Sequence, residues 1–397
     1  MGTSTIKAAL AEVGYGQEIT ILGVAQVLSF GLRKGNIVDI ESTSKSIENC
    51  LNDLERLTGV EILHALIGFS GISISAINNH AVIAVGNPTY EISQDDKERV
   101  LKSACNLALP PDKTIVQTVE RQYMIDGYDG VKDPTGMVGS RLEVEVVIIT
   151  AATAAIQNLH RSVQRINLHI DRAIYNPLLA AEAVLLPTEK EMGVVLVDIG
   201  GGTTEITFFE MGSIVTTAVL PVGGEYLTKD LAIVLRTSME EAARIKEKDG
   251  IVCRDMLEND NPIRVRNLQG KDSKEVSQQF VADILTARII EISEMIYSEL
   301  KQFDCLERIP AGIVLTGGEA QLPGIVEVLE EYINIPVRLG LPENIMGIPV
   351  DFNRPQNAAV LGGLICASRK MDISYQEKEG FSGLINKLLN WFRDLFS

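Results

Sequence analysis

Apolar residues recur along this chain in two patterns, one typical of helices and one typical of strands. Residues 17–30 alternate loosely and predict a strand that pairs in a hairpin. Residues 93–105 start with a Ser cap and an acidic first turn before an apolar stripe, which predicts a helix. Residues 43–59 predict an amphipathic helix whose apolar side chains share one face: Ile47, Leu51, Leu54 and Leu57.

The two patterns alternate through the rest of the chain. Short strands separated by Gly and Asn turns are predicted over 61–92, a strand over 142–150, and three hairpin strands over 193–224. The remaining predicted elements are two helical regions, a strand–turn–helix unit and a small-residue helix, around 225–249, 275–303, 312–333 and 358–367. Because strands, helices and Gly turns are mixed throughout, the predicted class is α/β.

Composition narrows the class of protein further. The 397 residues are 46% hydrophobic and 22% charged, an ordinary globular mixture that is long enough for two domains. The net charge of −17 argues against nucleic acid as a partner, because nucleic-acid binding needs Lys and Arg gathered on one face. The five cysteines are scattered and no secretory signal opens the chain, so we expect a cytoplasmic protein.

The long apolar runs do not predict a membrane span, and the histidines do not predict a metal site. The longest apolar run, 144–156, is shorter than the roughly 18–20 residues of a membrane span, and we interpret it as a buried strand entering a helix. The four histidines are not grouped with cysteines or carboxylates at metal-ligand spacing, so we interpret them as surface or half-buried residues: His64, His80, His160 and His169.

The most specific motif is "VLVDIGGGTTEITFF" over residues 195–209. Glycines allow the backbone to approach a ligand closely, and the amides of such a turn form an anion-binding nest. Asp198, at the end of the strand, can hold a hydrated divalent metal through water. A Gly-rich hairpin turn with no ligand is the alternative, but the Asp-x-Gly-Gly-Gly-Thr grouping favours phosphate. The expected contacts are Gly200, Gly201, Gly202, Thr203 and Thr204.

The opening "GTSTIKAALAEV" repeats the tail of this motif with Gly2, Thr3 and Ser4 before a strand. Two such hairpins that face each other across a cleft would clamp the two ends of a triphosphate. A third turn, Gly317 and Gly318, opens a helix and would let a nucleoside lie close to the backbone.

This ordered set of turns resembles the actin-like ATPase superfamily. Residues 127–150 and 66–86 are similar to the segments that leave and enter the extra subdomain of the FtsA family of bacterial division proteins. The resemblance implies an actin-like two-domain ATPase fold with an FtsA-type extra subdomain and a C-terminal amphipathic helix. Two small-residue helices, around 151–160 and 358–367, are expected to cross tightly and serve as a hinge.

The resemblance also implies a division into subdomains. The expected parts are 1A over 1–67, 144–180 and 355–371, 1C over 68–143, 2A over 181–219 and 303–354, 2B over 220–302, a linker over 372–380 and a membrane-targeting helix over 381–397.

The start of the chain departs from the family pattern, in which a first strand ends in an acidic residue before Gly-Thr. We expect that the natural reading frame continues upstream of Met1 with a short strand rich in Val and Ile that ends in Asp or Glu. A misassigned start or a truncation would explain the departure.

The last residues, "GFSGLINKLLNWFRDLFS" over 380–397, form an apolar stripe at helical spacing. Trp391 lies at its border, as an interfacial anchor would. The alternative is a terminal helix docked on its own core, which the polar linker before it disfavours. The residues expected to contact lipid are Phe381, Leu384, Ile385, Leu388, Leu389, Trp391, Phe392, Leu395 and Phe396.

The family resemblance implies ATP and Mg²⁺ as cofactors and weak or absent ATPase activity. Gly2, Thr3 and Ser4 are expected on one side of the β- and γ-phosphates and the 200–204 turn on the other. Asp198 would position Mg²⁺ and water, and Gly317 and Gly318 would pack on the adenosine. A helix over 240–250 lies where the nucleoside-facing helix should be; there Glu241, Arg244 and Lys246 either reach ribose or base or form an exposed charged face.

As a function, the resemblance implies an adaptor that polymerises on the cytoplasmic membrane at the division septum and tethers the FtsZ ring. The implied partners are FtsZ, further copies of the chain, membrane lipids and, through subdomain 1C, other division proteins. Arg288 is a candidate contact for an acidic FtsZ tail, and a solvated surface Arg is the alternative. The competing functions are a small-molecule kinase and a pilus-assembly ATPase of the same superfamily.

Overall fold

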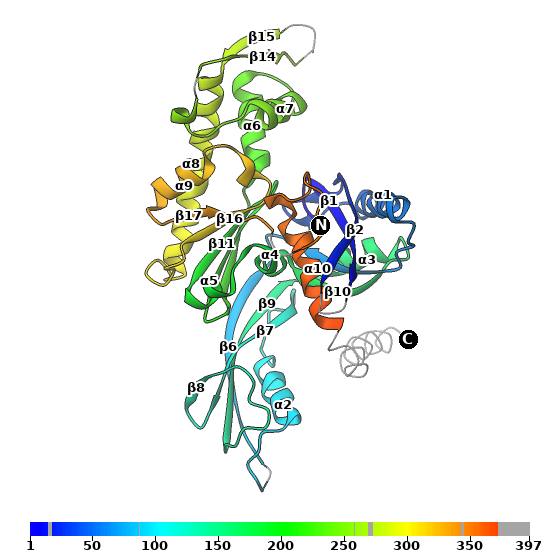
Figure 1. The fold of residues 1–397 in the computed structure, drawn as a ribbon, viewed down its shortest axis with the longest axis vertical. Coiled ribbons are helices and arrows are strands. Elements are labelled where there is room, and N and C mark those ends of the chain that lie inside the picture. Colours follow the sequence, from blue (N-terminus) through cyan, green and yellow to red (C-terminus); the bar gives the residue numbers. More distant parts are fainter. Residues whose placement is uncertain (15–17, 87, 258, 269–272, 343–344, 372–397) are drawn as a thin grey trace.

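The computed structural model describes residues 1–14, 18–86, 88–257, 259–268, 273–342 and 345–371. The molecule is elongated, with one group of strands and helices at each end and two groups side by side at the middle (Figure 1). Each group has its own sheet or hairpin, and the cavity described below lies where the two middle groups meet.

A five-stranded sheet forms the core of one middle group, in the order β13 (Ser213–Leu220), β12 (Thr204–Glu210), β11 (Val194–Ile199), β16 (Ile313–Thr316) and β17 (Val337–Leu339). The predicted three-strand hairpin unit is therefore confirmed as β11–β12–β13. β16 runs parallel to β11, so the turns that follow these two strands lie at the same edge of the sheet. The helices of this group are α5 (Pro187–Met192) and α9 (Ile325–Ile333).

The other middle group contains three separate strand pairs, of which β3 (Leu32–Arg33) with β4 (Asn36–Ile37) is the shortest. β1 (Thr5–Val13) and β2 (Ile19–Leu28) form the predicted antiparallel hairpin, and β5 (His64–Phe69) pairs in parallel with β10 (His169–Tyr175). The other elements of this group are α1 (Ile40–Thr58), α3 (Thr153–Gln164), α4 (Asn176–Val184) and α10 (Ala358–Met371).

The amphipathic face predicted for residues 43–59 is correct except at its end. Ile47 and Leu54 are buried in α1 and Leu51 is partly buried, but Leu57 is 64% exposed. Cys50 takes part in the buried face instead, at 1% exposure. The apolar stripe ends one turn early because Thr58 and Gly59 close the helix, with Gly59 in the left-handed region at φ 70°.

An inserted sheet projects at the bottom of the view in Figure 1, in the order β6 (Ser75–Ala84), β9 (Arg141–Ala152), β7 (Lys113–Ile125) and β8 (Tyr128–Val131), with α2 (Gln94–Ala104) packed on it. Ser93 and Asp96 form a capping box at the start of α2, as the Ser cap predicts. β9 runs from Arg141 to Ala152, so the expected boundary at residue 143 lies within this strand.

The upper group in Figure 1 is mainly helical and contains α6 (Gly224–Leu235), α7 (Met239–Asp249) and the 25-residue α8 (Gln278–Gln302). A small hairpin, β14 (Pro262–Arg266) and β15 (Ser273–Ser277), precedes α8 and was not predicted. Three short 3₁₀ helices complete the described elements: η1 (Arg254–Met256), η2 (Glu319–Gln321) and η3 (Pro355–Asn357).

The expectation that the small-residue helices around 151–160 and 358–367 cross as a hinge pair is wrong. Helix α10 packs mainly against α4, whereas α3 packs on α1, β9 and β10. A Cβ built on Gly362 of α10 would lie 1.7 Å from the Leu179 carbonyl oxygen of α4. The absence of a side chain at Gly362 is therefore what lets these two helices approach.

Candidate functional site

A cavity of about 800 Å³ lies between the two middle groups, and all three predicted Gly turns line it. Turn 1 is Gly2–Ser4, turn 2 is Gly200–Thr203 and turn 3 is Gly317–Gly318. The cavity also extends along β1 and β5, which line it from Thr5 to Leu10 and from His64 to Gly68. The structure thus brings together turns that are more than a hundred residues apart in sequence.

Turns 1 and 2 face each other at close range. A Cβ on Gly201 would lie 1.9 Å from the Ser4 hydroxyl oxygen, and a Cβ on Gly202 would lie 2.7 Å from the Thr3 hydroxyl oxygen. A side chain at either position would collide with the side chain of Ser4 or Thr3, so glycine lets turn 2 lie directly against turn 1.

The carbonyls of turn 2 are bound by the start of α6. The amides of Gly224 and Glu225 donate to the carbonyl oxygens of Gly200 and Gly201, at 2.9 and 2.8 Å. This pairing fixes the position of turn 2 relative to α6 and satisfies first-turn amides of the helix.

Turn 3 follows β16 and lies beside Asp198. Gly317 has φ 95°, and a Cβ there would lie 2.4 Å from an Asp198 carboxylate oxygen. A Cβ built on Gly318 would have no neighbouring atom within 4 Å. A flat group could therefore lie against the backbone of Gly318.

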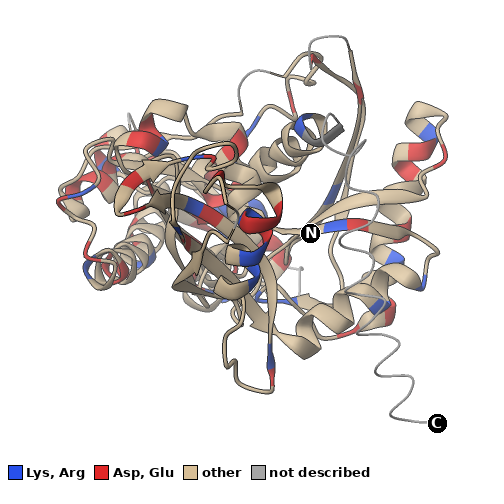
Figure 2. Cartoon of the chain, turned by 90° about the horizontal axis from the view of Figure 1, so that it is seen from below, with Lys and Arg blue, Asp and Glu red and all other residues tan. Residues whose placement is uncertain are grey.

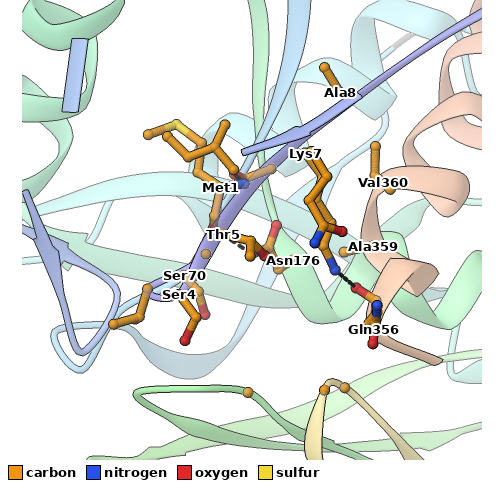
Figure 3. A pocket seen from close by; sticks show the side chains of 18 of the residues that line it. Met1, Ser4, Thr5, Lys7, Ala8, Ser70, Asn176, Gln356, Ala359 and Val360 are labelled. Carbon is orange, nitrogen blue, oxygen red and sulfur yellow. Dashed lines mark hydrogen bonds between the residues drawn. The ribbon is translucent and has the colours of Figure 1, made fainter. Parts of the chain in front are cut away.

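Asp198 and Lys7 are two charged residues that line the cavity. Burial raises the pKa of Asp198, and the Lys7 ammonium opposes this effect. Burial also lowers the pKa of Lys7 to about 8, and the Asp198 charge opposes that shift. Figure 3 shows Lys7 pointing from β1 to the carbonyl of Gln356, beside the first turn of α10. Lys7 was not predicted, although it lies only three residues after turn 1.

Glu205 is a second residue that the sequence analysis missed. It is 4% exposed and lines the cavity, where it accepts hydrogen bonds from the hydroxyls of Ser70 at 2.5 Å and Thr203 at 2.6 Å. Burial, with the negative charge of Asp198 added, raises its pKa. The motif itself contained the signal. Glu205 directly follows Gly-Gly-Gly-Thr-Thr at the start of β12, where the neighbouring residues are buried, and a buried carboxylate is costly unless it has partners.

Three other predicted contacts lie differently. The Thr204 side chain is fully buried and donates to the Val222 carbonyl at 2.9 Å, so it faces the interior rather than the cavity. Glu241 and Arg244 pair with each other on α7 at 2.9 Å and are not among the residues that line the cavity.

Lys246, on the same helix, does line the cavity. Its ammonium donates to Glu319 at 2.7 Å, which joins α7 to the residue after turn 3. With Lys7 and Arg354 it is one of the basic side chains on the cavity wall. Elsewhere Lys and Arg are interspersed with Asp and Glu over the described elements (Figure 2).

Arg288 lies away from the cavity on α8 and is largely engaged within its own subdomain. Its guanidinium pairs with Asp230 on α6 and with Glu291, and it lies 5.7 Å from the Tyr226 ring. A contact with an acidic partner would have to compete with these two carboxylates.

The chemistry of the site follows from these positions. Glycine backbone from two sides and the Lys7 and Lys246 ammonium groups suit an extended anion. Asp198 and Glu205 offer carboxylate oxygens, which are suited to hydrated Mg²⁺. Within the described ranges every helix is too short or too polar to cross a bilayer. The predicted lipid-binding helix over 381–397 lies outside the described residues.

Two family models match the chain. Residues 195–362 match the model described as "Cell division protein FtsA", and residues 71–150 match the "SHS2 domain inserted in FTSA". The second range coincides with the inserted sheet from β6 to β9.

Several known proteins are similar over most or all of the chain. Cell division protein FtsA of Pseudomonas aeruginosa is 35% identical over 405 residues, which covers 100% of this chain and 97% of that protein. FtsA of Bacillus subtilis is 37% identical over 348 residues, with 88% and 78% covered.

Solved structures share the fold at low sequence identity. The "PilM-PilN type IV pilus biogenesis complex" matches with a TM-score of 0.66 and 14% identity, covering 93% of this chain and 97% of that one. MreB5 of Spiroplasma citri bound to ADP matches with a TM-score of 0.55 and 13% identity, covering 94% and 96%. These likenesses support the predicted actin-like fold.

Proposed function

Since this chain belongs to the FtsA family of cell division proteins, we propose that it is an ATP-binding, filament-forming adaptor that tethers the FtsZ ring to the cytoplasmic membrane at the division site. The observation that carries the nucleotide part of this proposal is the meeting of turns 1 and 2 across the cavity beside Asp198 and Lys7. The matched insert over 71–150 favours this function over a pilus-assembly ATPase.

In this proposal the three turns bind different parts of the nucleotide. Turns 1 and 2 contact the β- and γ-phosphates through backbone amides, including that of Thr203, and through the hydroxyls of Thr3 and Ser4. Lys7 adds a positive charge at the phosphates, and turn 3 packs on the adenosine. Lys246 reaches the nucleoside end of the cavity from α7.

Asp198 and Glu205 would bind the Mg²⁺ that accompanies the nucleotide. Mg²⁺ keeps most of its water ligands and is bound through one or two carboxylates. We propose that Asp198 binds hydrated Mg²⁺ and that Glu205, fixed by Ser70 and Thr203, orients one of its waters. A bound cation would also relieve the repulsion between these two carboxylates.

Titration of Mg²⁺–ATP into the purified full chain tests the nucleotide site. Asp198→Asn is expected to weaken Mg²⁺–ATP binding by about tenfold or more, because it removes the charge that organises the hydrated cation. Gly318→Ala is expected to weaken binding by a smaller factor, because its methyl group fills the open space proposed for the adenosine.

Gly318→Ala is the more specific of the two variants, because its Cβ would have no other protein atom within 4 Å and the substitution would disturb only a bound ligand. A change at Gly201 would instead push on Ser4 and disturb the turns themselves. Gly86→Ala, equally free of contacts but in the inserted subdomain, is the control. Unchanged affinity in both site variants would exclude the proposed nucleotide site.

A further inference from the structure

A cluster of two histidines and one aspartate lies at the end of β5 that is opposite to Gly68. His64 begins β5, and His169 and Asp171 belong to the neighbouring strand β10. Their potential ligand atoms all lie within 4.8 Å of one another, the one such group of three among the described residues. The sequence alone did not suggest this cluster, because His64 is more than a hundred residues from its two partners.

Strand pairing places these side chains together. His64 and His169 are directly opposite in the parallel pair, and the amide of His169 donates to the Leu63 carbonyl at 2.8 Å. The register then shifts between Ile170 and Arg172, which leaves Asp171 as the extra residue of a bulge. Bulges of this kind redirect a side chain, and here the carboxylate turns to His64.

The contacts within the cluster are close. The Nδ1 of His64 lies 2.9 Å from an Asp171 carboxylate oxygen. The two imidazole rings meet edge to face with centroids 4.9 Å apart. The His64 and Asp171 side chains are 63% and 52% exposed, so an ion from solvent can reach them.

We propose that His64, His169 and Asp171 form a binding site for a divalent transition-metal ion of the zinc class. Two imidazoles and one carboxylate suit Zn²⁺ and its neighbours, whereas Mg²⁺ and Ca²⁺ prefer all-oxygen ligands. Tetrahedral Zn²⁺ with bonds of about 2.0–2.1 Å needs ligand atoms about 3.4 Å apart, so small side-chain rotations close the site. Water would complete the coordination.

This proposal does not rest on the nucleotide function, although His64 lines the same cavity at the end of β5 opposite to Gly68. Zn²⁺ would cross-link β5 to β10 at their shared end and so stabilise the folded chain. We therefore expect Zn²⁺ to raise the midpoint of thermal unfolding of the full chain in the absence of nucleotide.

Equilibrium dialysis of the nucleotide-free full chain with Zn²⁺ tests the proposal. We expect about one tightly bound ion per chain, with affinity lowered about tenfold or more in His169→Ala and in Asp171→Asn. His169→Ala removes a whole ring and could fail to fold. Asp171→Asn replaces one exposed oxygen and leaves the fold intact, so it tests the site independently. Co²⁺ serves as a second probe that distinguishes this site from a cysteine site. Thiolate ligands give bound Co²⁺ an intense near-ultraviolet absorption, which a site of two imidazoles and one carboxylate should not show.

His80→Ala is the matched control. His80 also pairs with a carboxylate, Glu143, at 2.8 Å, but has no second histidine beside it. Zn²⁺ affinity should be unchanged in this variant, and Zn²⁺ should still raise its unfolding midpoint. The proposal is overturned if the wild-type chain retains no Zn²⁺, if His169→Ala and Asp171→Asn bind it as tightly as wild type, or if His80→Ala alone loses it.

Discussion

At the scale of single residues, the cavity contains two carboxylates whose ionisation the fold opposes. Asp198 and Glu205 both have raised pKa values, because burial removes water from each and because Asp198 adds negative charge beside Glu205. Without a bound cation, the ionised forms of these two carboxylates destabilise the folded protein. A bound cation would favour the same ionised forms. Perturbed carboxylates of this kind are common at functional sites.

Glu205→Gln is expected to stabilise the nucleotide-free protein at high pH. With its pKa raised on folding, Glu205 contributes stability that is fully present below its ordinary pKa and is lost as the pH rises through the raised value. Gln keeps an oxygen for the Ser70 and Thr203 hydroxyls and carries no charge. The free energy of unfolding in urea should rise by roughly 1–3 kcal/mol at pH 8 and by clearly less at pH 5.

Glu12→Gln, at an exposed position on β1, is the control and should change stability little at either pH. An equal gain for Glu205→Gln at both pH values would contradict the proposed origin of the effect.

At the scale of elements, the sequence predicted those helices and strands that show clear apolar periodicity or a helix cap. The hairpin of β1 and β2, the helices α1, α2 and α3, and the unit β11–β13 lie where the patterns place them. The hairpin of β14 and β15 was missed because its strands have only five residues each and three residues of each strand are exposed. The packing of α10 on α4 was missed because small residues indicate that a helix is approached closely but not by which partner.

Two neighbouring glycines of α10 provide a test of that packing. Gly362→Ala should lower the free energy of unfolding by at least about 1–3 kcal/mol, because its Cβ would lie 1.7 Å from the Leu179 carbonyl and would force α10 away from α4. Gly363→Ala should be neutral or stabilising by up to about 1 kcal/mol, because its nearest neighbour is at an ordinary 3.7 Å and Ala favours helix. Urea unfolding of both variants checks this difference, and equal effects would refute the assigned helix contact.

At the scale of the whole molecule, the sequence predicted the three turns but not their surroundings. Lys7, Ser70 and Glu205 reach the cavity from separate strands or loops, and only the folded arrangement shows that they share it. The pairing of His64 with His169 has the same origin in strand register. The subdomain boundaries, the expected upstream strand and the C-terminal helix remain predictions.

The membrane part of the proposal is tested with anionic vesicles. Trp391→Glu with Phe392→Glu should abolish flotation of the full chain, because both changes place charge on or beside the predicted apolar stripe. Deletion of 381–397 should do the same and leave Mg²⁺–ATP binding intact. Asn386→Glu with Asn390→Glu adds the same charge on the opposite side of the predicted helix and should weaken flotation much less. Equal loss in both double variants would mean that net charge, rather than the apolar stripe, governs the attachment.

The hydrogen bonds between turn 2 and the start of α6 also have a mechanical consequence. α6 packs on α8, and its own 12 residues extend over about 18 Å. Helix α6 therefore forms a lever arm whose pivot lies at turn 2, and α8 is packed on this arm. A tilt of about 10° at the pivot would displace the far end of α6 by about 3 Å, which is the length of a hydrogen bond. An ångström-scale adjustment of Gly200 and Gly201 would thus be amplified into a change of surface at the tip of the molecule.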